Sequence, residues 1–279
     1  MKTKIIVDST IDIAAQWKSR VSVVPITVRF GEEEYLDGVT IDHQTFYEKL
    51  IECDRLPATS QATPEMFLTE FQKIRENHES AVVITISSKF SGTYQSAAIA
   101  AAKFENIYVV DSGNAAIGSG VLAERALQLA EEGMGAHEIA ERLGAEKEKI
   151  VLIALLDTLE YLKKGGRISK TVALAGAVLN IKPVISVTDG EIAILGKARG
   201  SKMGNNLLVQ EIEKTGGVNF QMPVLLGFTG LSDALLLKYM EDSKQLWKPG
   251  LEEIPYTTIG SSIGTHVGPG AIGAAFFKK

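Results

Sequence analysis

Residues 81–97 read A-V-V-I-T-I-S-S-K-F-S-G-T-Y-Q-S-A, an apolar run that passes through a hydroxyl-rich turn into an alanine-rich segment. A short apolar run without polar alternation is typical of a strand that is buried on both faces of its sheet. The segment after Gly92 has the composition of a helix. The stretch therefore predicts a strand, a serine-rich loop and a helix, which is the repeating unit of a doubly wound α/β fold.

The same alternation occurs on both sides of this unit. Strand-like runs at 4–10 and 107–112 are followed by helix-like runs at 11–18 and 119–130. A further helix is expected from Pro64, since Thr63 is a suitable N-cap and Phe67, Phe71 and Ile74 are spaced along one face. The pattern predicts an N-terminal domain, residues 1–150, built on a parallel sheet with helices on both faces.

A second domain, residues 151–279, is predicted where a charged helical stretch gives way to the apolar run that starts at Ile150. Within it, Asp189-Gly190 separates two β-rich runs, which is a strong signal for a hairpin. An antiparallel hairpin favours a mixed-sheet α/β domain.

Composition and charge exclude several classes of function. Of the 279 residues 45% are hydrophobic, and 29 basic residues face 34 acidic ones without a polybasic run, so nucleic-acid binding is not expected. Asp8 interrupts the first apolar run and no run reaches about 18 residues, so we expect a cytoplasmic protein. Cys53 is the only cysteine and the four histidines are scattered, so neither a metal nor another cofactor is expected.

Two formal motif matches fail on their context. The G-S-S-I-G at 260–264 places Ser262 at a nucleophile position, but no Asp or Glu follows it in the chain. The G-P-G-A-I-G at 268–273 is followed by only six residues, too few for a dinucleotide-binding unit. An acyl-ester hydrolase using Ser91 or Ser262 with His266 stays open as an alternative function, and a dihydroxyacetone-kinase-like catalyst is a weaker one.

Four hydroxyl- and glycine-rich segments, at residues 7–10, 58–64, 87–93 and 110–113, are expected where a doubly wound sheet places its ligands. Loops at the carboxyl ends of parallel strands meet at one crevice, where helix N-termini favour an anion. A carboxylate in such a crevice would accept hydrogen bonds from Thr59, Ser91 and backbone N–H groups. Ser87, Ser88 and Thr93 are equally well explained as helix caps, and the role of Asp8 stays open.

Two segments of the second half carry further candidates. The Lys-Lys-Gly-Gly-Arg sequence at 163–167 is typical of a helix end, but it also offers Arg167, whose planar guanidinium suits a carboxylate or a phosphate. His266 lies among five glycines, a density that indicates close approach of the backbone to a ligand or to another chain.

Taken in order, these segments resemble the DegV family of fatty-acid-binding proteins. The matching motifs are V-D-S-T, T-S-Q-A-T-P, S-S-K-F-S-G-T-Y-Q-S-A, V-D-S, L-E-Y-L-K-K-G-G-R-I-S, K-P-V-I-S-V-T-D-G with G-K-A-R-G, and G-T-H-V-G-P-G-A. They cover residues 5–273. Ala62, which stands where the family commonly has proline, is a visible departure and leaves Thr59 and Ser60 intact.

The resemblance implies one long-chain fatty acid bound between two α/β domains, and a non-enzymatic role as the acyl-carrying subunit of a bacterial fatty acid kinase. It implies that Thr59 and Ser91 hold the carboxylate, that His266 lies close to it, and that Arg167 lies near the mouth. The expected partners are the fatty acid, the kinase catalytic subunit and, transiently, a membrane. The full set of expected ligand-binding residues is Thr59, Ser60, Ser91, Gly92, Thr93, Arg167 and His266. The apolar stretch at 171–181 is a candidate lining of the lipid tunnel, or equally a helix core.

Overall fold

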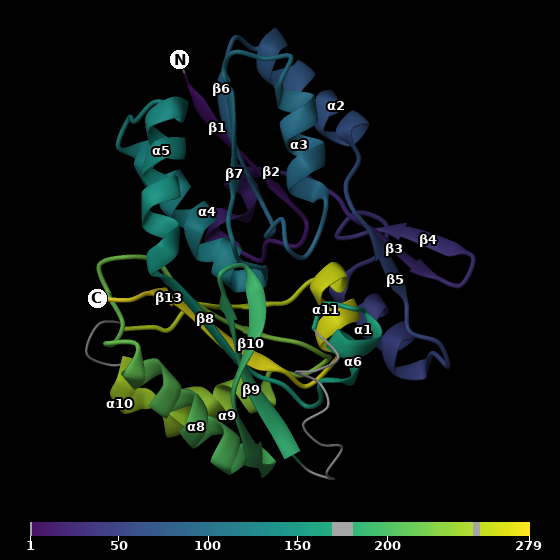
Figure 1. Cartoon of the computed structure of the whole chain (residues 1–279), viewed down its shortest axis with the longest axis vertical. Coiled ribbons are helices and arrows are strands. Elements are labelled where there is room, and N and C mark those ends of the chain that lie inside the picture. The colour runs from purple at the N-terminus through teal and green to yellow at the C-terminus, as the bar shows by residue number, and fades with distance from the viewer. Residues whose placement is uncertain (1, 169–180, 248–251) are drawn as a thin grey trace.

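The structure, a computed structural model, describes residues 2–168, 181–247 and 252–279. Its upper half in Figure 1 is built on a four-stranded parallel sheet with the order β2-β1-β6-β7. The strands are β1 (Thr3–Asp8), β2 (Val21–Val24), β6 (Ser80–Thr85) and β7 (Ile107–Asp111). The helices α2 (Pro64–Glu76) and α3 (Thr93–Ala101) cover one face, and α4 (Ala116–Glu131) and α5 (Ala136–Glu146) cover the other. The predicted doubly wound arrangement is confirmed.

Helix α2 forms as its sequence predicts. The Thr63 hydroxyl accepts a hydrogen bond from the Met66 N–H at 3.4 Å, and Pro64 occupies the first turn. Phe67, Phe71 and Ile74 are buried against the sheet. The aromatic side chains of this helix therefore belong to the core and not to a site.

The lower half contains a six-stranded mixed sheet with the order β10-β9-β8-β13-β11-β12. Its strands are β8 (Ile150–Leu155), β9 (Ile181–Thr188), β10 (Glu191–Arg199), β11 (Val224–Phe228), β12 (Tyr256–Thr258) and β13 (Ile272–Phe277). Helices α8 (Gly200–Lys214), α9 (Ala234–Asp242) and α10 (Lys244–Trp247) pack on one face. Helix α4 packs on the opposite face and also on the parallel sheet, so it joins the two halves.

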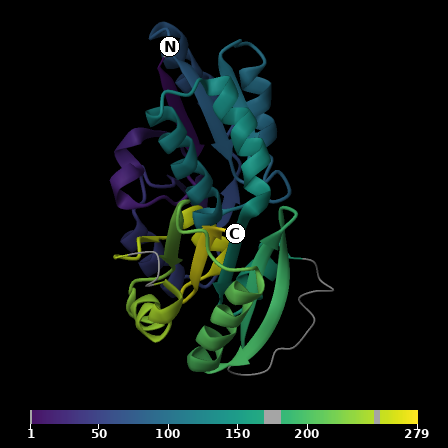
Figure 2. The same cartoon turned by 90° about the vertical axis from the view of Figure 1, so that its left-hand side faces the viewer.

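The hairpin of β9 and β10 turns at Asp189-Gly190, as predicted. Both residues have positive φ, 52° and 78°. A type I′ turn requires positive φ at both central residues, and its twist matches that of the two strands. At this tip the Gly190 carbonyl accepts a hydrogen bond from the Ser87 hydroxyl at 2.9 Å. Figure 2 shows the hairpin, in green, reaching the upper half of the molecule. The hairpin thus contacts the serine-rich loop that follows β6, which is one of the segments expected to form the crevice.

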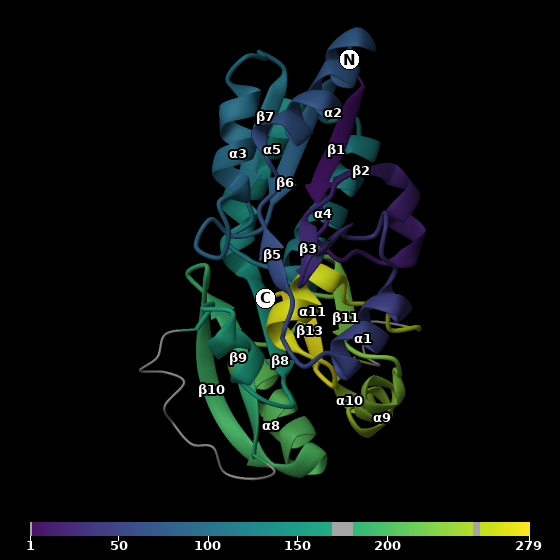
Figure 3. The same ribbon diagram turned by 90° about the vertical axis from the view of Figure 1, so that its right-hand side faces the viewer.

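A small antiparallel sheet, which the sequence reading did not predict, lies beside the junction of the two halves (Figure 3). It has the order β4-β3-β5 and consists of β3 (Thr27–Phe30), β4 (Glu33–Leu36) and β5 (Ala58–Ser60). Helices α1 (His43–Glu52), α6 (Glu160–Lys164) and α11 (Ser261–Val267) pack around it. Cys53 follows α1 directly and is half-buried.

The helix expected at 11–18 does not form. The chain is irregular from Ser9 to Ala14 and then forms a 3₁₀ helix, Ala15–Arg20; a second, short 3₁₀ helix covers Lys147–Lys149. The Ala14 N–H donates to the buried Glu124 carboxylate at 2.8 Å, and the Asp12 carboxylate accepts from the Gly260 N–H at 2.9 Å. The first bond occupies a backbone donor that a helix over 11–18 would use, and the second ties the Asp12 side chain to a distant part of the chain.

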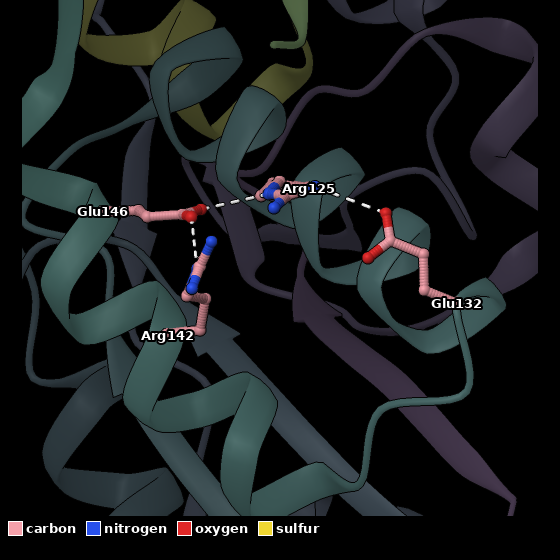
Figure 4. Close-up of polar contacts among 4 residues, drawn as sticks. All are labelled: Arg125, Glu132, Arg142 and Glu146. Carbon is pink, nitrogen blue, oxygen red and sulfur yellow. Dashed lines mark hydrogen bonds and ion pairs between the residues drawn. The ribbon is translucent and has the colours of Figure 1, made fainter.

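An ion-pair network holds α5 against α4 (Figure 4). The two oxygens of Glu146 accept hydrogen bonds from Arg125 Nε at 3.0 Å and from Arg142 Nε at 2.6 Å, and Arg125 also lies 3.7 Å from Glu132. The Arg125 and Glu146 side chains are only 13% and 15% exposed, so solvent screens this pair less than a surface pair.

The domain boundary expected at residue 150 stays a prediction. Ile150 is the first residue of β8.

Candidate functional site

A largely apolar cavity lies between the two halves of the molecule. It occupies about 1020 Å³, including the part that is open to solvent. Its apolar wall comes from both halves and includes Ile26, Ile86, Ile117, Leu152, Ile185 and Ile272. Its polar lining residues include Thr59, Ser60, Gln61, Ser91, Arg167 and His266.

Small residues form part of the cavity wall in adjacent strands of the six-stranded sheet. Ala154, Gly273 and Gly227 are neighbours in register across β8, β13 and β11. A Cβ at Gly227 would lie 2.7 Å from Ile259, which would have to shift, and a Cβ at Gly273 would be in tight contact with Ala154 at 3.2 Å. The sequence reading missed these residues, although an isolated glycine in a strand indicates close approach of another group.

The polar end of the cavity is organised by Thr59 and His266. Thr59 lies on β5, opposite Val28 of β3, and its Oγ1 is 2.9 Å from Nε2 of His266 on α11. Helix α11 is held at its start by the Asp37 carboxylate, which accepts from the N–H groups of Ser261 and Ser262 at 3.1 and 3.0 Å. These anchors fix the position of the imidazole relative to β5.

Burial lowers the pKa of His266 to about 4, and the neighbouring Arg167 guanidinium contributes in the same direction. The ring is therefore neutral at pH 7 and carries one N–H. Its Nδ1 is buried and has no hydrogen-bond partner within residues 2–168, 181–247 and 252–279. A Cβ at Gly165 would overlap this nitrogen, which explains the glycine at the start of Gly165-Gly166-Arg167.

Ser91 lies in the loop between β6 and α3 and lines the cavity. Its Oγ is 2.9 Å from the Thr93 hydroxyl and accepts a hydrogen bond from the Thr93 N–H at 3.3 Å. Thr93 is fully buried and does not line the cavity. Thr93 thus orients the Ser91 hydroxyl from behind.

A shallow outer hollow is lined by residues 59–61, residues 88–92 and Arg167. Gly92 lines this outer hollow but not the apolar cavity. A Cβ at Gly92 would overlap the Gln61 side chain, whose Nε2 donates to Ser96 at 3.0 Å. Glycine at this position lets the strand β5 segment lie close to the start of α3. Ser60, beside Thr59, lines both the cavity and the outer hollow.

Arg167 lies at the junction of the cavity and the outer hollow, and it lines both. Its Nη1 donates to the Gly165 carbonyl at 2.7 Å and its Nε donates to the Phe90 carbonyl at 3.3 Å. The preceding helix α6 ends at Lys164, and Gly166 has a positive φ of 70°. The Lys-Lys-Gly-Gly-Arg segment therefore ends helix α6 and also places the Arg167 guanidinium at the mouth of the cavity.

Ser87, Ser88 and Asp8, whose roles the sequence did not decide, form hydrogen bonds within the protein. The Ser87 hydroxyl bonds the hairpin tip, and the Ser88 N–H donates to the Asp111 carboxylate at 3.2 Å. Asp8 is buried and accepts from the Ile86 N–H at 2.8 Å and from Thr10. Burial raises the pKa of Asp8, and these hydrogen bonds oppose the shift. Ser87, Ser88 and Asp8 do not line the cavity.

Two parts of the expected crevice are placed differently from the sequence reading. The segment at 110–113 lines a separate polar cleft and not the cavity. Thr59 reaches the site from the small antiparallel sheet, and not from the end of a parallel strand. The apolar stretch at 171–181 lies outside the described residues except for Ile181.

The glycines around His266 serve protein packing. A Cβ at Gly264 would lie 2.5 Å from the Tyr47 hydroxyl, and one at Gly268 would overlap the Tyr161 ring. Gly268 also has a positive φ of 76°. The many glycines around His266 predict that the backbone lies close to another group. At Gly264 and Gly268 that group is an aromatic side chain of the protein.

The constellation needed for serine hydrolysis is not assembled. Ser91 Oγ pairs with Thr93, and His266 Nε2 pairs with Thr59. The part of the chain that the structure describes shows no acidic partner at His266 Nδ1 and no partner at Ser262 Oγ. It also contains no group of three or more His, Cys, Asp or Glu side chains arranged for a metal ion. None of its helices combines the length and apolarity needed to cross a membrane.

Together, the fold and the site define an α/β protein with three sheets and a largely apolar cavity that ends in a group of hydroxyls, a neutral histidine and an arginine. The sequence matches the DegV family over residues 2–279. The chain belongs to this family.

Relatives along the whole chain agree with this assignment. A DegV domain-containing protein of Caldanaerobacter subterraneus is 33% identical, with 100% of this chain and 99% of the relative aligned. A Thermus thermophilus structure described as fatty acid binding of a DegV family protein is 28% identical with a TM-score of 0.89, covering 100% of both chains. A stearic-acid-binding protein from Eubacterium ventriosum is 27% identical with a TM-score of 0.87, covering 99% of this chain and 98% of that one.

Proposed function

We propose that the protein binds one long-chain fatty acid in the cavity between its two halves. The observation that carries this proposal is an apolar cavity with Thr59, Ser91, Arg167 and His266 gathered at a polar end. A fatty acid has the same division into an apolar chain and one charged group. The similarity to the fatty-acid-binding proteins of Thermus and Eubacterium supports the assignment.

In this proposal the acyl chain supplies the affinity and the polar end supplies the orientation. Burying about fifteen methylenes at roughly 0.8 kcal/mol each stabilises the complex by on the order of 12 kcal/mol before the costs of association. Thr59 and Ser91 donate hydrogen bonds to the carboxylate, each worth about 1.5–3 kcal/mol because the acceptor is charged. Ser60 and the neutral His266 complete the surroundings of the carboxylate, Thr93 orients Ser91, and Gly92 lines the outer hollow beside it.

We further propose that the bound carboxylate is presented to a separate kinase that forms the acyl phosphate, so that the protein is a substrate-carrying subunit and not itself an enzyme. Arg167 supports this role, since it lines both the cavity and the outer hollow through which a partner would reach the carboxylate. A cytoplasmic location and a transient membrane contact, at which the lipid is exchanged, belong to the same proposal.

The hydrolase alternative finds no support in the geometry, because the two candidate serines do not pair with His266. Ester cleavage by the purified protein that is lost in Ser91→Ala would nevertheless restore it.

Native mass spectrometry tests fatty-acid binding. The purified protein is expected to carry one fatty acid whose mass is lost on denaturation, or to take up one added equivalent of palmitate. Ala154→Phe, which puts a ring where a small side chain lines the cavity, is expected to reduce the bound fraction strongly. Ala102→Phe, the same change at an exposed position after α3, should bind as the wild type does. Wild-type protein that stays lipid-free in added palmitate would overturn the proposal.

A further inference from the structure

The Ser262 hydroxyl is a polar group within the cavity that the proposed fatty-acid site does not use. Ser262 lies on α11, is 2% exposed and lines the cavity. Its Oγ has no hydrogen-bond partner within the described part of the chain. A buried hydroxyl without a partner costs free energy, and such groups are uncommon in native proteins. Its position in the cavity wall therefore points to a ligand that satisfies it.

The hydroxyl is not needed to cap its own helix. The N–H groups at the start of α11 are already bonded by two carboxylates, those of Asp37 and Asp12. Asp37 takes the N–H groups of Ser261 and Ser262, and Asp12 takes that of Gly260. The side chain of Ser262, and not the end of the helix, is the feature that lacks an explanation.

Three other hydroxyls that line the cavity, those of Thr10, Ser186 and Thr229, have partners in the protein. Thr10 donates to the Asp8 carboxylate, and Ser186 lies 3.1 Å from the Thr188 hydroxyl. Thr229 accepts from the Ala271 N–H at 2.8 Å. Ser262 lies between two isoleucines in the sequence, Ile259 and Ile263, that also line the cavity. A water molecule needs two to four polar partners, so a single hydroxyl on such a wall is a poor water site.

The position of Ser262 relative to His266 indicates which part of a ligand would meet it. The two residues are four apart on α11, so their side chains project from the same face, about one turn or ~6 Å apart along the axis. His266 contacts Thr59 at the polar end. A fatty acid whose carboxylate is bound there would pass Ser262 with one of its first carbons.

We propose that Ser262 is a subsite for an oxygen substituent, a hydroxyl or an oxo group, on the acyl chain near the carboxyl end. A serine hydroxyl both donates and accepts, so it can pair with either substituent. This inference rests on the proposed function. It adds a substrate class, the hydroxy and oxo fatty acids, to the simple fatty acids that an apolar cavity would accept.

Binding affinities test the subsite. The ligands are palmitate and three hydroxypalmitates, with the hydroxyl at carbon 3, 5 or 16. Each Kd is measured for the wild type, Ser262→Ala and Ser261→Ala. The compared quantity is the ratio of the palmitate Kd to the hydroxypalmitate Kd. In Ser262→Ala this ratio is expected to fall on the order of five- to tenfold for carbon 3 or carbon 5. The ratio for carbon 16 should not change. Ser261→Ala, the same change at a buried neighbour that does not line the cavity, should keep the wild-type ratios.

Two results would overturn the inference, and they are distinguishable. If wild type binds palmitate and Ser262→Ala leaves all three ratios as they are, the subsite is wrong and the proposed function stands. If wild type binds neither palmitate nor any hydroxypalmitate, the proposed function fails and the subsite fails with it. Thermal unfolding of the lipid-free variants checks that each one is folded.

Discussion

Thr59 Oγ1 and His266 Nε2 lie 2.9 Å apart, and this contact joins a strand of the small antiparallel sheet to the last helix of the chain. The pair lies at the polar end of a cavity that is otherwise largely apolar. Because the two residues are 207 positions apart, the site exists only when both halves of the chain are folded together.

Removing the Thr59 hydroxyl tests its role in holding the carboxylate. Thr59→Val keeps the shape of the side chain but loses the donor, so the Kd for palmitate should rise about tenfold or more. Isothermal titration of lipid-free protein measures this change. Thr69→Val, at an exposed position of α2, is the matched control and should bind like wild type. An unchanged Kd in Thr59→Val would show that the hydroxyl does not contact the ligand.

Gly165 is predicted to be essential for the position of His266. Its φ of −73° is ordinary, and a Cβ here would overlap the imidazole, while the next closest group would be the Tyr161 carbonyl oxygen at 3.1 Å. Gly165→Ala should displace the ring from Thr59 and weaken palmitate binding by roughly tenfold, which titration and a crystal structure of the variant would show. Gly144→Ala, where a Cβ meets open space on α5, should have no such effect. A wild-type imidazole position in Gly165→Ala would contradict the prediction.

The low pKa of His266 makes a spectroscopic prediction. In lipid-free protein, the imidazole signal that disappears in His266→Asn should titrate near pH 4 and stay constant between pH 5.5 and 8. Since the folded-state pKa lies below the ordinary value of 6.5, this group stabilises the fold above pH 6.5. That stability is lost as the pH falls through the interval from 6.5 to 4. A midpoint near 6.5 would show that the ring is hydrated and not buried.

Glu124 makes a pH prediction of opposite sign. Burial raises its pKa from 4.5 to about 7, and its carboxyl accepts from the Ala14 N–H. The fold therefore favours the protonated form, and its contribution is fully present below pH 4.5 and lost as the pH rises through 7. Glu124→Gln keeps an acceptor without a charge, so relative to wild type it should gain on the order of 3 kcal/mol of unfolding free energy between pH 5 and pH 8.5. Urea unfolding at both values measures this, and an equal pH dependence in both proteins would refute it.

Arg167 is predicted to act in phosphoryl transfer more than in lipid retention. Arg167→Ala should still purify with, or take up, one fatty acid, but transfer by the partner kinase should fall at least about tenfold in kcat/KM. Arg167→Lys, which keeps the charge but not the planar fork, is expected to recover part of the rate. Equal losses of lipid binding and of transfer in Arg167→Ala would place the guanidinium in the lipid site itself.

The parts of the fold that follow from local patterns were predictable. The buried strand at 80–85, the capped helix from Pro64 and the hairpin at Asp189-Gly190 each carry their signal within a few residues. The irregular segment before Ala15 was not predictable, because the Ala14 N–H and the Asp12 carboxylate bond to groups more than a hundred residues away. Propensity cannot anticipate such partners.

The candidate site shows the same division. Hydroxyl, arginine and glycine patterns made Thr59, Ser91, Arg167 and His266 candidates, and the structure brings all four to one cavity. The alternating segment at 27–36 with a turn at Gly31 is a hairpin signal that would have revealed the sheet on which Thr59 lies. Gly227 and Gly273 become recognisable as part of the cavity wall only when β11 and β13 are paired.

A crystal structure of the protein saturated with palmitate tests the central claim most directly. The account predicts one acyl chain inside the cavity, with a carboxylate oxygen within about 3 Å of the hydroxyls of Thr59 and Ser91 and with His266 beside it. Palmitate density outside the cavity, or a chain that enters with its methyl end at Thr59 and His266, would contradict the account.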